Sequence, residues 1–147
     1  MKRIIIALMI CATAATGAAI AQDGPIKQRQ ALMKKNGEAA KLINAMFKGE
    51  KPYDAAAATD AIKGIGAVMD EFITLFPEGS TSADSAAKPE IWKNKADFEG
   101  WAAQVKTDTP KTAAAAAGGM ASLQPAFAEF AKSCRGCHED YRTEKKK

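Results

Sequence analysis

The spacing of apolar side chains limits the fold of this chain more than any other feature of its sequence. Two long segments, residues 54–76 and 122–143, have apolar residues at intervals of three and four. The first set is Ile62, Ile65, Met69, Phe72 and Phe76, and the second is Leu123, Phe127, Phe130, Cys134, Cys137 and Tyr141. Residues at these intervals share one face of an α-helix. Each segment is therefore predicted to be a helix that buries one face.

Two further helices are predicted from their boundary residues and apolar stripes. One covers residues 25–48, because Pro25 suits the first turn of a helix and Gly49 suits a stop. Its stripe is Met33, Ala40, Ile43 and Phe47. The other begins near Glu90 and carries Trp92, Phe98, Trp101 and Val105. Pro110 is expected either to kink this helix or to divide it, before an alanine run that ends at two glycines.

The connections between these helices also have sequence signals. Asp54 is predicted to cap the helix that follows it, and Pro77 to end that helix. Gly64 and Gly66 weaken the same helix and would permit close packing against a neighbour. Residues 77–89 are rich in Gly, Ser, Thr and Asp and predict a long loop. Four helices joined in this way predict an all-α fold, an antiparallel four-helix bundle.

The first 21 residues have the pattern of a secretory signal peptide. Two basic residues precede the apolar run Ile4–Cys11, and Ala19-Ile20-Ala21 offers a cleavage site before Gln22. A membrane anchor is disfavoured because the apolar run is shorter than the ~20 residues that a spanning helix needs. Cleavage would leave one exported domain, residues 22–147, without stable membrane insertion. Its formal charge would fall from +4 to +2, which gives no indication of nucleic acid as a partner.

The chain has three cysteines and one histidine. Cys11 falls in the predicted signal peptide, which leaves Cys134 and Cys137 beside the single histidine, His138. This C-x-x-C-H sequence is the attachment signal for c-type haem. On a helix both thiols share a face with His138, so they can reach the two vinyl groups of one porphyrin edge while the imidazole lies under the iron. We therefore predict one covalent haem c, with His138 as the proximal ligand.

Other uses of this motif have less support. A thioredoxin-type redox disulfide normally occurs in a βαβ unit, which the helical pattern does not contain. A structural zinc site would need a second pair of cysteines or histidines, and residues 22–147 have none. A haem-free structural or metal-handling four-helix protein stays open as an alternative of another class.

The position of the motif near the C-terminus makes a family resemblance specific. From Gln22 onward the chain resembles the class II c-type cytochromes, the cytochrome c′ family. The matching sequences are Arg29-Gln30, Lys88-Pro89-Glu90-Ile91-Trp92, and Cys134 to His138 followed by Tyr141-Arg142. The resemblance implies a left-handed four-helix bundle, a periplasmic location and, in many members, a homodimer formed by the first two helices. It also implies that Arg142 lies beside the proximal haem pocket, although a basic residue at a helix C-terminus is favourable in any case.

No second histidine is available for the distal side of the iron, which leaves methionine, lysine, water or no ligand. Met33 is the favoured candidate because it lies on the apolar stripe of its helix, one turn after Arg29, a candidate partner for a haem propionate. The resemblance implies that the position of Met33 holds either a coordinating methionine or a bulky apolar lid. Residues 32–37, 49–54 and 75–77 are similar to those of the low-spin, methionine-ligated members. Met33 is therefore predicted to bind the iron.

These residues together predict a carrier that exchanges single electrons with redox partner proteins, because a Met/His iron is low-spin and has a raised potential. The alternative is a five-coordinate protein that binds nitric oxide or other small gases, with Met33 as the distal lid. Nothing in the sequence indicates paired catalytic carboxylates, a nucleophile with a base, or a phosphate-binding loop. An enzymatic activity is therefore not predicted.

Overall fold

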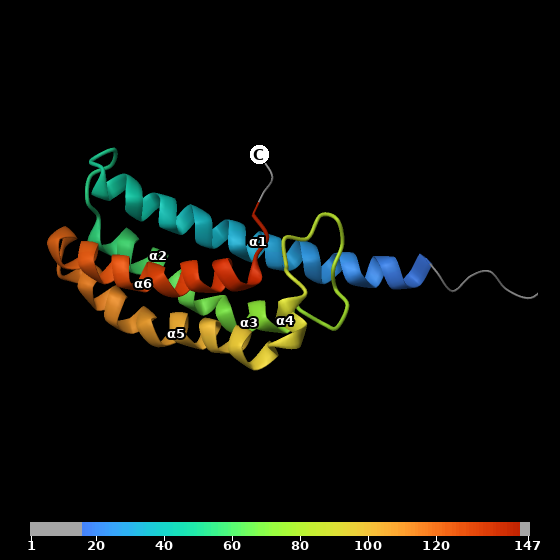
Figure 1. Cartoon of the computed structure of the whole chain (residues 1–147). Coiled ribbons are helices and arrows are strands. Elements are labelled where there is room, and N and C mark those ends of the chain that lie inside the picture. The colour runs from blue at the N-terminus through green and yellow to red at the C-terminus, as the bar shows by residue number, and fades with distance from the viewer. Residues whose placement is uncertain (1–15, 145–147) are drawn as a thin grey trace, which may run out of the picture.

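The computed structural model describes residues 16–144, with side chains from Gly24 onward, and this range contains six helices (Figure 1). They are α1 (Thr16–Phe47), α2 (Ala55–Ala67), α3 (Met69–Thr74), α4 (Glu90–Lys93), α5 (Lys95–Ala117) and α6 (Met120–Tyr141). The predicted signal peptide lies largely outside the described residues. Within them, no helix combines the length and the apolar character that crossing a membrane requires.

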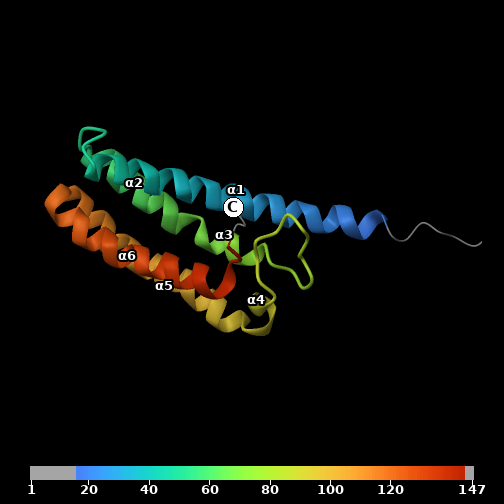
Figure 2. The ribbon, with the colours of Figure 1, turned by 45° about the horizontal axis from the view of Figure 1, so that its top comes forward.

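The long helices form a four-helix bundle, as the sequence predicted. The bundle has four arms: α1, then α2 together with α3, then α5, then α6. Each arm runs antiparallel to the arm before it in the chain (Figure 1). Helix α1 packs on α2, α2 packs on α5, and α5 packs on α6. Figure 2 shows α1 and α2 along one side of the molecule and α5 and α6 along the other. The residues 77–89 connect the α2–α3 arm to α4 and α5, and they lie near the C-terminal end of α6.

Two clusters of buried side chains hold the bundle together. The larger one, which we call the central core, lies among all four arms. Its buried members are Ile43, Met46, Ala58, Ile62, Ile65, Met69, Ala102, Val105, Ala113, Ala116, Leu123, Phe127 and Phe130. The smaller one, the aromatic cluster, consists of Phe76, Ile91, Phe98 and Tyr141. Most of the predicted stripe residues belong to one cluster or the other, so the predicted helix faces are confirmed.

The predicted helix over residues 54–76 is present, but it is interrupted. Asp54 caps α2 as predicted: its side chain accepts a hydrogen bond from the Ala57 backbone N–H at 3.0 Å. Val68 then separates α2 from α3, and α3 ends before Pro77. The interruption follows two glycines of low helix propensity, Gly64 and Gly66.

The first helix does not begin at Pro25, as predicted, but at Thr16. Alanines at positions 18, 19 and 21 are strong helix formers, and the fixed φ angle of proline is compatible with a helix. Pro25 contributes no backbone N–H donor, but it lies inside α1 and does not end the helix.

The third arm has a break that the sequence did not predict, and of the two outcomes expected at Pro110 the division of the helix is absent. Pro110 does not divide it but lies inside the continuous helix α5, and the break occurs earlier, at Asn94 between α4 and α5. Threonine hydroxyls on either side of Pro110 donate to the carbonyl oxygens four residues before them, Thr109 to Val105 at 2.7 Å and Thr112 to Asp108 at 2.9 Å. These bonds satisfy helix carbonyls around the position where the proline donates none.

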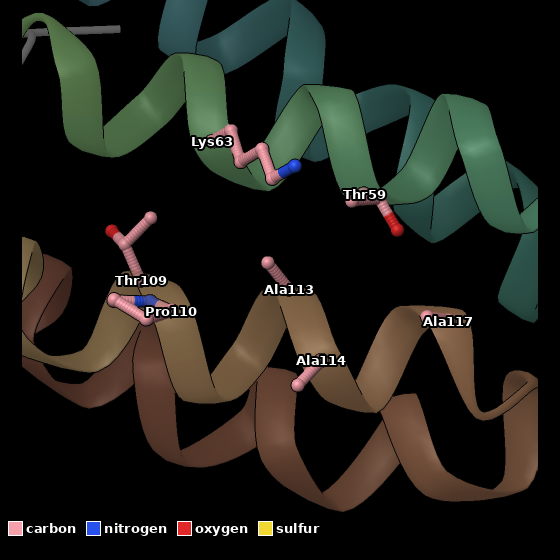
Figure 3. Close-up of a pocket in the computed structure, with 7 residues that line it drawn as sticks. All are labelled: Thr59, Lys63, Thr109, Pro110, Ala113, Ala114 and Ala117. Atoms are coloured by element: carbon pink, nitrogen blue, oxygen red, sulfur yellow. The ribbon is translucent and has the colours of Figure 1, made fainter.

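Helices α2 and α5 approach each other closely at Gly66. A Cβ atom at this position would lie 2.3 Å from the Thr109 Oγ1 atom, so the contact requires glycine. Next to it, an apolar groove between the two helices is lined mainly by small side chains (Figure 3). The lining residues are Thr59, Lys63, Thr109, Pro110, Ala113, Ala114 and Ala117. The prediction of close packing is therefore confirmed for Gly66, whereas a Cβ at Gly64 would meet nothing within 4 Å.

This difference predicts opposite effects for two similar substitutions. Gly66→Ala should lower the free energy of unfolding by about 1–3 kcal/mol, because the added methyl group collides with Thr109. Gly64→Ala should raise it by about 0.5–1 kcal/mol, because alanine is the better helix former and the site is open. Denaturant unfolding followed by circular dichroism measures both. Equal effects of the two substitutions would contradict the close approach of α2 and α5.

Candidate haem site

Cys134 and Cys137 lie on α6, three residues apart, and both are free, half-buried thiols. Cys134 packs against the central core, and Cys137 packs against the aromatic cluster. Burial raises the pKa of Cys134, and it raises the pKa of Cys137 to about 12, with smaller contributions from Cys134, Asp140 and Asp97. Both thiols are therefore protonated near neutral pH and face the interior of the bundle.

His138 follows in the last turn of α6 and is exposed at the surface. Partial burial of the ring lowers the pKa of His138, and the positive charge of Arg142 lowers it further. Both effects favour the neutral imidazole, which is the form that binds a metal ion. Among the described residues, no three His, Cys, Asp or Glu side chains converge to hold a metal ion by themselves.

Position 136, inside the motif, requires glycine because of steric contact with a neighbouring helix. A Cβ atom at Gly136 would lie 2.4 Å from the Trp101 Cη2 atom, because the indole of α5 packs directly on this part of α6. The Trp101 Nε1 atom is buried and has no hydrogen-bond partner. The sequence placed Trp101 among the apolar residues of its helix but did not predict this contact. A glycine in the middle of a helix, at a cost of about 1 kcal/mol, is the signal that could have indicated it.

Arg29 lies on α1 and is almost completely buried, with 4% of its surface exposed. Its guanidinium donates to the Leu75 carbonyl, to both the hydroxyl and the carbonyl of Ser80, and to the Ser85 hydroxyl. It also lies over the Phe76 ring, 4.6 Å from the ring centre. Burial lowers the pKa of Arg29. No carboxylate of a described residue forms a salt bridge with this buried charge.

Met33 lies one turn after Arg29 on α1 and is half-buried against the central core. The two α1 residues and the two cysteines thus contact the same pair of clusters. Met33 and Cys134 pack on the central core, whereas Arg29 and Cys137 contact the aromatic cluster. Helices α1 and α6 have no extended close backbone contact within the described part of the chain. Met33 and Arg29 therefore lie on α1 and the motif lies on α6, and buried side chains of the two clusters separate these helices.

Tyr141 and Arg142 end α6 beside the motif. Tyr141 is buried in the aromatic cluster, and its hydroxyl donates to the Asp97 carboxylate at 2.6 Å. This hydrogen bond, followed by burial and the charge of Asp97, raises the pKa of Tyr141 to about 12. Arg142 is exposed, and its backbone N–H donates to the His138 carbonyl at 3.1 Å. Its positive charge lies close enough to His138 to lower the pKa of the imidazole.

These residues have the donor set that a covalent haem requires. Two free thiols and a neutral imidazole lie at intervals of three and four on one helix, which is the arrangement of c-type attachment. The buried guanidinium of Arg29 lacks a carboxylate partner among the described residues, and the Trp101 Nε1 atom lacks an acceptor. A haem with two propionates would bring acidic oxygen atoms to this end of the bundle.

Comparison with known proteins agrees with this assignment. A protein-family model described as Cytochrome C′ matches residues 24–142. The chain belongs to the cytochrome c′ family. One covalent haem c is therefore its cofactor, and the predicted resemblance to class II c-type cytochromes is confirmed.

Individual cytochromes c′ and c-556 match over most of their length. A cytochrome c′ from Rhodopseudomonas palustris is 38% identical over 88% of this chain and 89% of its own. A cytochrome c-556 from Agrobacterium fabrum is 36% identical over 96% of this chain and 95% of its own. The carbon monoxide-bound structure of a variant cytochrome c′ from Alcaligenes xylosoxidans has a TM-score of 0.73 and 27% identity, covering 84% of this chain and 97% of its own. None of these three names is that of an enzyme.

The bond between Tyr141 and Asp97 predicts a pH-dependent stability. Tyr141→Phe should lower the free energy of unfolding by about 1 kcal/mol near neutral pH, because it removes this hydrogen bond. The pKa of Tyr141 is raised in the folded protein, so its contribution is complete below the unfolded value of about 10. It is lost as the pH rises toward about 12, where parent and variant should converge.

Chemical unfolding at a series of pH values measures this difference. Asp97→Ala should show the same loss near neutral pH, and the double variant should show little more than either single one. An effect of Tyr141→Phe that is constant up to pH 12, or that simply adds to that of Asp97→Ala, would contradict the coupling.

Proposed function

We propose that this protein is an exported, periplasmic carrier of single electrons, with residues 1–21 as its signal peptide. Thioether bonds to Cys134 and Cys137 would hold the haem, His138 would be the proximal iron ligand, and Met33 the distal one. The observation that carries this proposal is the position of Met33, half-buried on α1 against the same core as Cys134 on the opposite helix. When bound, the haem supplies a one-electron redox centre whose potential a Met/His ligand pair raises.

The other methionines of the described chain are less suitable distal ligands. Met46 and Met69 are buried in the central core, where their side chains fill space between helices. Met120 is 39% exposed and lies in the first turn of α6, far along the helix from the motif. Met33 alone follows Arg29 by one turn and is only half-buried.

Two arginines would complete the site. Arg29 is a buried cation that contacts the aromatic cluster, as Cys137 does, so it is suited to bind a propionate in addition to its present acceptors. Arg142 would lie by the proximal pocket, where its charge already lowers the pKa of His138. A neutral His138 is the state that binds iron.

A second candidate function is the binding of small gases such as nitric oxide at a five-coordinate iron, with Met33 as an apolar lid. The favouring observation is the carbon monoxide-bound structure of the related variant from Alcaligenes xylosoxidans. Both functions use the same haem attachment and differ only in whether Met33 binds the iron. In either case the protein would exchange electrons or gases without transforming a substrate. Redox partner proteins and a homodimer are the partners that we propose for it.

Replacement of Met33 distinguishes the two functions. Met33→Ala should convert the haem-loaded protein from low-spin to high-spin, because the iron loses its distal sulfur ligand. Carbon monoxide should then bind to the reduced variant at least about tenfold faster than to the parent protein, because no internal ligand has to leave first. Absorption spectra of both oxidation states and stopped-flow mixing measure these changes.

Met120→Ala is the matched control, because Met120 is exposed and distant from the motif along α6. It should leave the spectrum and the rate of carbon monoxide binding unchanged. A parent protein that is already high-spin, and whose spectrum Met33→Ala does not alter, would favour the gas-binding function instead.

A further inference from the structure

The residues 77–89, which we call the α3–α4 loop, form hydrogen bonds with α1 through residues 80–85. Arg29 NH2 donates to the Ser80 carbonyl and to the Ser85 hydroxyl, each at 2.7 Å, and Arg29 NH1 donates to the Ser80 hydroxyl at 3.1 Å. Gln30 donates to the Asp84 carbonyl at 2.8 Å. Ser80 is completely buried. Two successive residues of α1 therefore bind one short stretch of this loop.

The same loop binds the end of α6 directly after the haem motif. The Lys88 backbone N–H donates to the Tyr141 carbonyl at 2.9 Å, and the Thr143 N–H donates to the Ala86 carbonyl at 2.8 Å. The Lys88 Nζ atom donates to the Glu139 carbonyl at 2.6 Å. These bonds surround an isolated antiparallel bridge between Ala87 and Arg142. Figures 1 and 2 both show the loop beside α1 and near the C-terminal end of α6.

Besides these hydrogen bonds, α1 buries Ile26 and Leu32 in the same region and packs Met33 on the central core. Of the helices that the structure describes, only α2 packs closely along α1. The turn after Phe47 joins α1 to α2 at the end of the bundle remote from the haem motif. At the end with the motif, the α3–α4 loop connects α1 to α6 through its hydrogen bonds.

We propose that Ser80 and Ser85 are positioning residues for the distal side of the haem site. They hold the Arg29 side chain, and through it they hold the segment of α1 that carries Met33, at a set distance from His138. The inference rests on the proposed position of Met33 over the iron, but it applies whether Met33 is a ligand or a lid. The Ser80 and Ser85 hydroxyls accept hydrogen bonds from a buried cation, so their loss leaves Arg29 donors unsatisfied.

The test compares serine variants of the haem-loaded protein. Ser80→Ala, Ser85→Ala and the double variant should bind carbon monoxide faster than the parent does after reduction, by about fivefold in the double variant. Ser82→Ala is the matched control, because Ser82 is an exposed residue of the same loop. It should bind carbon monoxide at the parent rate. If the double variant folds poorly, the rates of carbon monoxide binding to Ser80→Ala and Ser85→Ala still test the proposal.

A second measurement detects the position of α1 without relying on gas binding. Hydrogen–deuterium exchange should become faster in α1 around residues 26–36 of the Ser80 and Ser85 variants. Exchange in residues 40–47 and in residues 123–134 should stay at the parent rate, because residues of both segments pack in the central core. A global loss of stability would instead speed up exchange in every helix.

The outcomes separate this inference from the proposed function. Faster gas binding together with local exchange in α1 supports the positioning role, and this result is independent of the spectrum of Met33→Ala. Serine variants that match Ser82→Ala in either measurement would overturn it. The serine substitutions should also be made in Met33→Ala. If they speed up carbon monoxide binding there as much as in the parent protein, the proposal is overturned, because the serines would then act independently of Met33.

Discussion

The apolar face of α6 both fills the core of the bundle and carries the two cysteines of the haem motif. In its first half, Leu123, Phe127 and Phe130 fill the central core, and the same face continues as Cys134, Cys137 and Tyr141. The thiols therefore occupy positions that the helical repeat directs into the bundle, and the packing of α6 on α5 determines where they lie. Gly136 and Trp101 show how tight this packing is, because no side chain larger than hydrogen fits between them.

The opposite helix is held in a different way. Helix α1 packs along α2, and near the haem motif it is joined to the rest of the fold by polar contacts from Arg29 and Gln30. A buried guanidinium is costly unless its donors are satisfied, and here serine hydroxyls and carbonyl groups satisfy them. The α6 side of the site thus depends on apolar packing. On α1, hydrogen bonds through the α3–α4 loop add to the burial of Ile26 and Leu32.

The four helices and the motif were predictable because both depend on local spacing. The intervals of three and four along residues 54–76 and 122–143 directly identify the buried faces, and Asp54 identifies one helix start. The effects of Pro25 and Pro110 were not predictable in the same way, because the residues around each proline decide whether the helix continues. Contacts between distant segments, such as Trp101 with Gly136 or Arg29 with Ser80, depend on tertiary packing that one sequence does not specify.

In the electron carrier that we propose, the chemistry of the site would depend on a single bond, the one between the iron and the Met33 sulfur. X-ray absorption at the iron edge of the oxidised, haem-loaded protein observes this bond directly, because sulfur and nitrogen scatter differently. We expect six coordinating atoms, of which five are nitrogen and one is sulfur, and we expect the sulfur signal to be lost in Met33→Ala. A parent protein with five nitrogen atoms and no sulfur around the iron would contradict this expectation.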